Sequence, residues 1–405
     1  MATPVNELDV PTIDLLDVPF EQAQAMVRDV ATEHWLLKNP FGYTVMRYDD
    51  VTAVLRDKRW HNAAALIPRM AGVTNEEFLG RQRISILSAE GDVHTRLRRL
   101  VAPAFSPRAA DHLRPFMREV INGLADVVAS TGRADVAVDI CEPYPIPIIC
   151  ELLGAPKSDW QLFSRLAEDV LRIFNGMLDD DLPIIMRAQD ELDEYVRGLI
   201  AARRAHPADD LITALIAAEE AGDRLDTAEL VTMVGAVIVG GTDTTRNQLG
   251  CSVALFAQHP EQWALLAQRP ELAGRAVEET MRCFGAVRGT GRFASVDIEY
   301  RDVIFPAGTM MMPSLSVANR DPNVFADPST FDITADAPAQ PQLTFGSGIH
   351  YCLGASLARA ELQEALPILA RRMPDLRIDG AVTWKPSNVG IFGAEHLPVT
   401  FTPTA

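Results

Sequence analysis

The sequence lacks a long apolar run and an excess of basic residues, and each absence removes a class of function. Its longest nearly apolar stretch, Leu230 to Gly241, falls short of the about 20 residues that cross a hydrocarbon layer, so we expect no membrane span. Lys and Arg number 37 against 55 Asp and Glu, for a formal net charge of −18. Nucleic-acid binding is therefore disfavoured, because phosphate contacts depend on basic side chains.

Cysteines are also few, and no segment has the composition of a linker. The five cysteines are an odd and dispersed set, which is typical of free thiols and not of a disulfide framework. The segment from Met1 to Glu7 lacks the apolar stretch of a secretory signal, so we expect a cytoplasmic protein. No repeat or low-complexity stretch divides the 405 residues, and we expect one domain over residues 1–405, with about residues 1–20 loosely ordered.

Most of the chain shows helical periodicity. Apolar residues recur at three- and four-residue spacing over 110–130, 158–175, 184–204, 226–258, 260–284 and 353–372. Strand signals are sparse and fall at 41–47, 297–312 and 398–402, with a turn at 306–308. The expected fold class is therefore mainly α with small β-sheets.

The segment 226–258 is unusual because it is apolar around its whole circumference, which predicts a buried helix. Asp226 and Glu229 form a capping box at its start. Two adjacent glycines, Gly240 and Gly241, cost a helix about 1 kcal/mol each relative to alanine. They permit either the close approach of a ligand, with a kink, or close helix packing, and taken alone the packing explanation is favoured.

Cys352 lies in a glycine-rich loop, residues 345–354, directly before a helical run. Backbone N–H groups and the positive end of the following helix favour a thiolate there, which would be a metal ligand or a nucleophile. His350 is the only nearby metal-binding residue, so a zinc site with several ligands is poorly supported. Single ligation of a haem iron fits better, with Gly354 leaving room for a flat macrocycle.

This loop resembles the haem-binding loop of the cytochrome P-450 family of haem-thiolate monooxygenases, a soluble bacterial type, and the resemblance extends over roughly residues 40–400. The matching positions are Phe345, Gly346, Gly348, His350, Cys352 and Gly354. The resemblance implies the cytochrome P-450 fold, with a long central helix over the haem. It also implies haem b, iron protoporphyrin IX, as the cofactor.

Further motifs match the family in order, and their roles are those that the resemblance implies. Asp243 and Thr244, after the glycine pair, would deliver protons to bound dioxygen. Glu279 and Arg282 match the family's structural ion pair. Cys352 would ligate the iron. The other implied cofactor contacts are His94, Arg98, Arg292 and His350 at the haem propionates, and Phe345, Gly346, Gly354 and Gly241.

Segments that line the substrate pocket in the family also match, although core packing competes for each apolar residue. They contribute Ile86, Leu87, Ala236, Val239, Gly240, Val287, Arg288, Ile391 and Phe392, within a C-terminal stretch that begins at Val389. Arg288 is the charged member, and it predicts a substrate with a carboxylate or another acceptor. The substrate itself and the oligomeric state stay undetermined.

The chain departs from the family pattern in places. Ala335 stands where the family usually has an arginine that completes the network of Glu279 and Arg282, so the partners of that pair are open. Ala286 and Val287 replace the usual Pro-Val pair, and Gln342 stands at a common histidine position. We interpret these changes as structural.

The resemblance implies a monooxygenase that inserts one atom of dioxygen into an apolar small molecule. Electrons would come from NAD(P)H through a ferredoxin reductase and a ferredoxin, because the chain leaves no room for a fused reductase. A basic face formed by Arg96, Arg99, Arg108 and Arg359 would steer an acidic ferredoxin. The alternatives are a peroxide-driven peroxygenase, a non-catalytic haem sensor and, weakest, a thiol hydrolase.

Overall fold

The computed structural model describes residues 2–14, 20–70, 72–174, 178–220, 225–386 and 390–404. The helices are α1 (Phe20–Glu33), α2 (Tyr48–Arg56), α3 (Ile67–Met70), α4 (Glu76–Ile84), α5 (Gly91–Val101), α6 (Pro107–Ala129), α7 (Pro145–Leu153), α8 (Trp160–Leu171), α9 (Leu178–Ala205), α10 (Leu211–Glu220), α11 (Thr227–Gln258), α12 (Pro260–Gln268), α13 (Ala273–Phe284), α14 (Leu315–Ala318) and α15 (Ala355–Arg372). The strands are β1 (Thr3–Pro4), β2 (Leu36–Asn39), β3 (Gly42–Val45), β4 (Trp60–Asn62), β5 (Arg133–Asp135), β6 (Arg292–Ala294), β7 (Ile298–Tyr300), β8 (Val303–Phe305), β9 (Met310–Pro313), β10 (Arg377–Ile378), β11 (Thr383–Trp384), β12 (Ala394–His396) and β13 (Pro398–Thr400).

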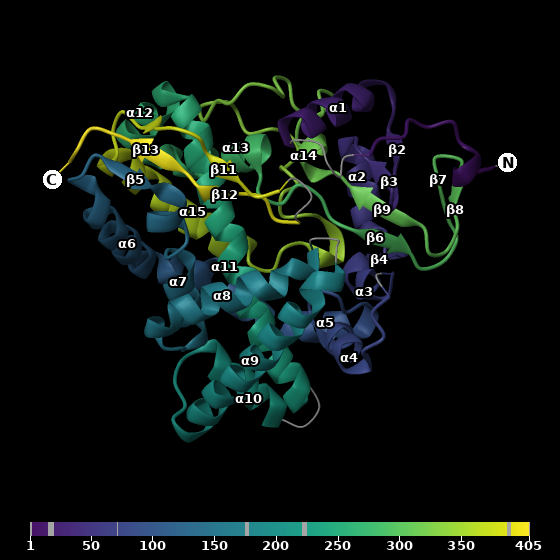
Figure 1. Cartoon of the computed structure of the whole chain (residues 1–405), viewed down its shortest axis with the longest axis horizontal. Coiled ribbons are helices and arrows are strands. Elements are labelled where there is room, and N and C mark those ends of the chain that lie inside the picture. Colours follow the sequence, from purple (N-terminus) through teal and green to yellow (C-terminus); the bar gives the residue numbers. More distant parts are fainter. Residues whose placement is uncertain are drawn as a thin grey trace.

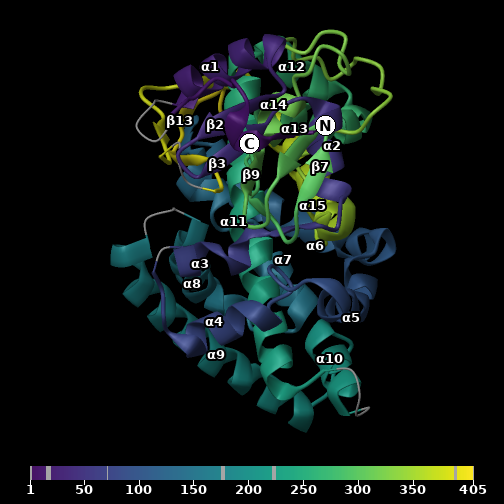
Figure 2. The ribbon, with the colours of Figure 1, turned by 90° about the vertical axis from the view of Figure 1, so that its right-hand side faces the viewer.

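The largest sheet lies apart from most of the helices, whereas β5 and β13 lie among helices near the C-terminus (Figure 1). Figure 1 shows α6 to α10 on one side and the strands β2, β3, β4, β6 and β9 on the other, near the N-terminus. Both Figure 1 and Figure 2 place α11 in the middle, between the region of α9 and α10 and the region of α12 and α13. The mainly α fold with small sheets is confirmed.

The largest sheet joins distant parts of the sequence. Its strand order is β2-β3-β9-β6-β4, so strands from residues 36–62 interleave with strands from residues 292–313. β3 runs parallel to β9, whereas β6 is antiparallel to both β9 and β4. In this register Arg292 lies opposite Asn62, which brings the start of β6 beside the residues that precede α5.

The N-terminal segment pairs with strands β8 and β2. β1 pairs in parallel with β8, and Thr12 bridges to Lys38 of β2. Main-chain pairing to existing strands therefore involves residues 3, 4 and 12 of the segment that the sequence predicts to be loosely ordered. Residues 1 and 15–19 lie outside the described part of the chain.

α11 is the long buried helix that the sequence predicts. The Asp226 carboxylate accepts the Glu229 N–H, and the Glu229 carboxylate accepts the Asp226 N–H, so the capping box is confirmed. At 1.5 Å per residue its 32 residues span about 48 Å. The helix is uninterrupted through Gly240 and Gly241, so secondary structure gives no sign of an open hydrogen-bond ladder there.

Other sequence predictions need correction in detail. One helix over 260–284 is wrong, because the chain breaks between α12 and α13 at Arg269, which precedes Pro270 and has φ −127° and ψ 70°. α8 ends at Leu171 and continues as a short 3-10 turn to Phe174, whereas residue 175 lies outside the described residues. Within the described residues, no helix is both long and apolar enough to span a bilayer.

Candidate functional site

The loop before α15 presents Cys352 on a tightly closed backbone. The Cys352 N–H donates to the Phe345 carbonyl at 2.9 Å, which closes the loop. Gly346 and Gly348 have φ angles of +71° and +74°, a left-handed region that favours glycine. A Cβ on Gly348 would also stand 2.2 Å from the Leu55 carbonyl oxygen, so the loop can approach α2 only with glycine at this position.

Gly354 leads from this loop into α15, and its surroundings are open. A Cβ built at this position has no heavy atom within 4 Å. The position therefore offers the clearance beside Cys352 that a flat macrocycle requires. Cys352 itself is partly exposed, whereas Cys141, Cys150, Cys251 and Cys283 are all buried.

The protein alone does not favour a thiolate at Cys352. Burial raises the pKa of the Cys352 thiol, and this effect outweighs the Gly354 N–H and the charges of Arg98 and Arg359, which lower it. The Gly354 N–H thus favours the thiolate, as the sequence predicts, but desolvation is the larger effect. A metal cation would deprotonate the thiol, since coordination stabilises the thiolate directly.

A cluster of basic side chains from three segments lies beside the loop. The rings of His94 on α5 and His350 in the loop are 4.4 Å apart between centroids. Arg98, one turn after His94, donates from Nη2 to the Tyr351 carbonyl at 2.5 Å. The structure thus brings these three predicted cofactor contacts together.

Arg292 is the most telling member of this cluster, because its exposed fraction is only 3%. Its Nη1 donates to Thr290 Oγ1 at 3.0 Å and to the Gly291 carbonyl at 2.8 Å, both neutral partners. Burial lowers the pKa of Arg292 to about 10, and the Glu90 charge offsets this only in part. Among the described residues, no carboxylate forms an ion pair with Arg292 or Arg98.

Glu90 connects the two halves of the cluster. Its Oε1 lies 2.9 Å from His350 Nε2 and accepts the N–H of Asn62, the residue opposite Arg292 in the sheet. Burial, together with the charges of His350 and Arg98, lowers the pKa of His94 to about 4. One carboxylate serving several bases leaves the cluster short of negative charge, so these residues fit the two carboxylates of a haem.

One stretch of α11, at Gly240, is open, whereas most of the helix is buried. Gly240 is exposed, and the Thr244 hydroxyl donates to the Gly240 carbonyl at 3.0 Å. Gly241 differs, because a Cβ there would stand 2.3 Å from Ile149 Cδ1 of α7. Gly241 thus permits close packing of α11 against α7, and its contact with the cofactor stays a prediction.

Asp243 lies beside this open stretch but is 5% exposed. Its Oδ1 forms ion pairs with Arg246, one turn along α11, and with Lys385 Nζ at 3.2 Å. Its backbone carbonyl accepts the Asn247 side-chain amide at 2.7 Å. The sequence analysis did not predict either cation as a partner of Asp243. Pairs at i,i+3 spacing are common on helices, and Lys385 is remote in the chain.

The predicted pocket segments divide into two groups by exposure. Leu87 is 42% exposed, and Gly240 is exposed. Val287 and Ile391 form an isolated antiparallel β-bridge and are partly exposed, which brings two predicted segments together. The remaining partly exposed members are Ala236 and Arg288.

Three other predicted pocket residues are packing residues here. Ile86, Val239 and Phe392 are 9%, 3% and 2% exposed and belong to hydrophobic clusters. The Phe392 ring is covered on its two faces by Trp384, stacked at 5.2 Å, and by the guanidinium of Arg288 at 3.1 Å. Their assignment to the pocket wall is therefore not supported. Val389 lies outside the described residues.

Glu279 and Arg282 have other partners in place of the arginine that the family usually has at position 335. Arg282 forms a two-pronged ion pair with Glu279, at 2.7 and 2.8 Å. It also donates to the backbone carbonyls of Asn319, Pro328 and Thr330. Backbone groups thus take the place of the side chain that Ala335 lacks.

Glu361 is a residue of the site that the sequence analysis missed. It lies on α15 at 1% exposure, and its Oε1 has no hydrogen-bond partner among the described residues. Burial raises the pKa of Glu361 to about 8, although a hydrogen bond from Thr245 of α11 lowers it. No pattern in the sequence singles it out, because Glu364 and several other polar residues lie on the same helix.

Within the described residues, no group of three or more His, Cys, Asp or Glu is arranged to hold a metal ion. A metal at this site would therefore need ligands from outside the chain, as a haem iron has. The geometry consists of a thiol on a closed loop, an acid-poor basic cluster beside it, and an open stretch of α11 with a threonine and an acid. This arrangement suits haem-thiolate chemistry.

The comparisons with known proteins agree with this geometry. A sequence model of the family described as Cytochrome P450 matches residues 33–268 and 262–372. The chain is 35% identical over 397 residues to luteothin monooxygenase from Streptomyces thioluteus, covering 97% of this chain and 96% of the relative. It is 37% identical over 375 residues to nocardicin C N-oxygenase from Nocardia uniformis subsp. tsuyamanensis, covering 89% and 91%. The crystal structure of CalO2 superposes with a TM-score of 0.90 at 30% identity, covering 98% of this chain and 100% of the other.

Proposed function

The chain belongs to the cytochrome P450 family and is a monooxygenase, and from that premise we propose that it oxygenates an apolar small molecule with electrons from a separate ferredoxin. The observation that carries the proposal is the closed Cys352 loop beside the buried Arg292, which has no carboxylate partner among the described residues. We propose that the whole chain acts as one haem-binding unit, and that it works in the cytoplasm.

The residues that would hold the haem are Cys352 at the iron and His94, Arg98, Arg292 and His350 at the propionates. The haem, when bound, supplies the site where dioxygen is split once two electrons and two protons have arrived, one oxygen atom passing to substrate and the other to water. Cys352 donates electron density, and the two arginines hold carboxylates through charge-assisted hydrogen bonds.

Thr244 and Asp243 would manage the protons. The Thr244 hydroxyl lies on the open stretch of α11 beside Gly240, where it both donates and accepts hydrogen bonds. Asp243 would pass protons from solvent, and its pairs with Arg246 and Lys385 would have to loosen while it does so. The pair would thus decide between substrate oxygenation and release of peroxide.

The proposed substrate is apolar with one acceptor group. Support for the apolar part comes from the partly or largely exposed side chains of Leu87, Val287 and Ile391. Support for the acceptor comes from Arg288, whose guanidinium stacks on Phe392 and so stays at the pocket segment instead of reaching bulk water. A carboxylate is the group that an arginine fork binds best.

The proposed ferredoxin surface is smaller than the sequence suggested. Arg96 pairs with Glu229, and Arg359 pairs with Glu278, so neither guanidinium is available to attract an acidic partner. Arg99 and Arg108 are exposed, as is Arg56. Arg56 donates to Ser347 of the Cys352 loop at 2.9 Å, which supports a docking face at that loop. The reductase would take its electrons from NAD(P)H.

The test is to substitute the proton-managing pair and measure product formed per NAD(P)H consumed, with one confirmed substrate. Thr244→Ala should still bind substrate and consume reductant, but much of the reductant should appear as hydrogen peroxide. Asp243→Asn should slow turnover, since positioned acid–base groups contribute about 10²–10⁴-fold. A solvent isotope effect on the rate should change with it.

Thr227→Ala is the matched control, because Thr227 lies at the start of the same helix and bonds Glu219 far from the pair. It should leave coupling and rate unchanged. Unchanged coupling and rate in Thr244→Ala and Asp243→Asn as well would refute the proton role. That result would favour the peroxygenase or the haem sensor, neither of which needs the pair.

A further inference from the structure

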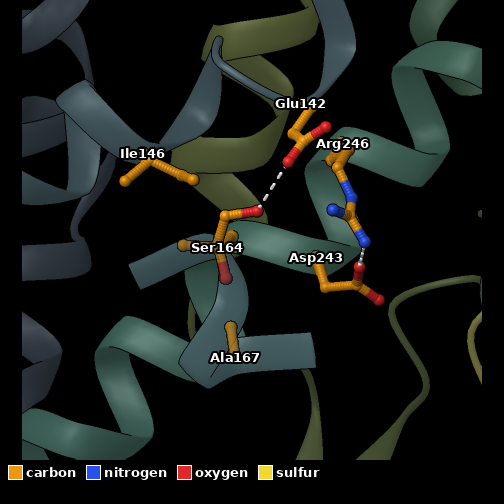
Figure 3. A pocket seen from close by; sticks show the side chains of 7 residues that line it. Glu142, Ile146, Ser164, Ala167, Asp243 and Arg246 are labelled. Carbon is orange, nitrogen blue, oxygen red and sulfur yellow. Dashed lines mark hydrogen bonds and ion pairs between the residues drawn. The ribbon is translucent and has the colours of Figure 1, made fainter. Parts of the chain in front are cut away.

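A small polar pocket adjoins Asp243 on a second face of α11. Its walls include Thr242, Asp243 and Arg246 of α11, Ser164 and Ala167 of α8, and Glu142 just before α7. Figure 3 shows two interactions at its wall, the ion pair of Asp243 with Arg246 and the hydrogen bond of Ser164 with Glu142. The pocket has room for about one water molecule, and polar groups on several sides could hold it.

Helical geometry sets Asp243 at the edge between two faces. Successive residues of a helix are about 100° apart. Thr242 and Arg246 therefore point into the pocket, whereas Gly240 and Thr244 lie on the adjacent open face. Asp243 falls between the two sets, so its carboxylate can receive a proton from the pocket and serve the threonine beside it.

A second, outer hollow is the more open of the two and shares Glu142 and Ser164 with the inner pocket. Its other walls include Trp160, Gln161 and Glu168 of α8. The two hollows thus share the hydrogen-bonded pair in which Ser164 Oγ donates to Glu142 Oε1 at 3.0 Å.

We propose that Glu142 and Ser164 form the proton inlet of the enzyme, passing protons from the outer hollow through one water in the inner pocket to Asp243. A carboxylate and a hydroxyl both accept and release protons, so the pair can relay them without moving apart. Each proton that Asp243 gives up is replaced by one from bulk water, and no charge accumulates. The inference rests on the proposed function, in which Asp243 feeds Thr244.

The test compares two ways of driving the same holoenzyme with one confirmed substrate. Reductase and ferredoxin require protons from solvent, whereas iodosylbenzene donates an oxygen atom without electrons or protons. Glu142→Gln and Ser164→Ala should slow the ferredoxin-driven rate about tenfold, less than the 10²–10⁴-fold of a group that acts directly, and change its solvent isotope effect. Their iodosylbenzene-driven rates should stay at the wild-type level.

Matched controls are Glu151→Gln and Ser158→Ala, two exposed residues that line neither pocket. Both should behave as wild type in both assays. Equal losses in the two assays, or no loss, in Glu142→Gln and Ser164→Ala would overturn the inlet and indicate a structural cross-link or another route. Failure of the wild type itself in both assays would instead overturn the proposed function, and the inlet with it.

Ala167 offers a second variant and a readout that does not depend on activity. It is 1% exposed and lines the inner pocket, so Ala167→Val should fill the space for the water. A crystal structure of the wild type should show a water within hydrogen-bond distance of Ser164 Oγ and the Asp243 carboxylate, and that of Ala167→Val should not. A wild-type pocket without that water would overturn the inlet.

Discussion

Two buried arginines, Arg282 and Arg292, show how the same side chain serves the fold in one place and a ligand in another. For Arg282, burial lowers the pKa, but the hydrogen bonds and charge of Glu279 raise it by more, so its pKa is raised overall. For Arg292, burial dominates and the pKa falls to about 10. The first cation is neutralised within the chain, whereas the second has no carboxylate partner among the described residues and is the one that we propose binds an anion from outside.

This difference teaches that a buried charge has to be judged by its partners. Burying an unpaired cation is costly, so a fold keeps one only where something else compensates for it. Arg282 is compensated by Glu279 and three backbone carbonyls. In the proposed function, a haem carboxylate compensates the charge of Arg292.

Removing Arg282 should have the largest effect. Arg282→Ala leaves the Glu279 carboxylate without its cation at 16% side-chain exposure, and breaking a buried pair costs about 3–5 kcal/mol. The free energy of unfolding, measured in denaturant, should fall by that amount. Arg269→Ala is the control, since its pair with Glu271 is exposed, and it should change stability little. Equal stability of Arg282→Ala and wild type would remove the contrast.

Removing Arg292 should weaken haem binding without unfolding the chain. Hydrogen bonds to charged groups contribute about 1.5–3 kcal/mol, so Arg292→Leu should raise the dissociation constant of haem about 10- to 100-fold. The haem-free protein should be as stable as the wild type or more stable, because an unneutralised buried charge is gone. Haem titration and denaturant unfolding measure the two effects. A loss of stability with unchanged haem affinity would place Arg292 in the same class as Arg282.

Glu361 extends the comparison to a buried acid, whose effect should appear only within a window of pH. Its folded pKa of about 8 lies above the ordinary carboxyl value of 4.5, so between these pH values the folded chain keeps a proton that the unfolded chain releases. Stability should therefore fall as pH rises through this window, by up to about 1.4 kcal/mol per pH unit. Glu361→Gln should lack this contribution. If the free energies of unfolding of the wild type and Glu361→Gln changed in parallel from pH 5 to 8, the raised pKa of Glu361 would be contradicted.

The sequence predicted most of what depends on local pattern. The loop around Cys352, the capping box of α11 and the strands near residues 42–45 and 298–313 follow from glycine positions, helix caps and side-chain alternation. The basic cluster was predicted only through the family resemblance. Among the described residues, Arg292 lacks an acidic partner because the strand register sets it opposite Asn62. No local sequence pattern encodes that register.

The contacts that the sequence did not predict share one cause, which is that packing between distant segments is invisible in the sequence. Gly241 was assigned to the cofactor, and nothing in the sequence indicated that Ile149 of α7 also approaches it from another helix. Phe392 was assigned to the pocket, but Trp384 and Arg288 cover it. The inlet pair was missed for the same reason, since Glu142 and Ser164 are ordinary surface-type residues until α8 brings them together.

The most direct measurement of haem ligation by Cys352 is the spectrum of the reduced, carbon monoxide-bound protein. Cys352→Ser should lose the thiolate-type spectrum, whereas Cys283→Ser, which changes a buried thiol packed beside Arg282, should keep it. The same pair of variants compares the ligand region with the structural one. A thiolate-type spectrum in Cys352→Ser, or its loss in Cys283→Ser alone, would contradict the assignment of Cys352 as the axial ligand.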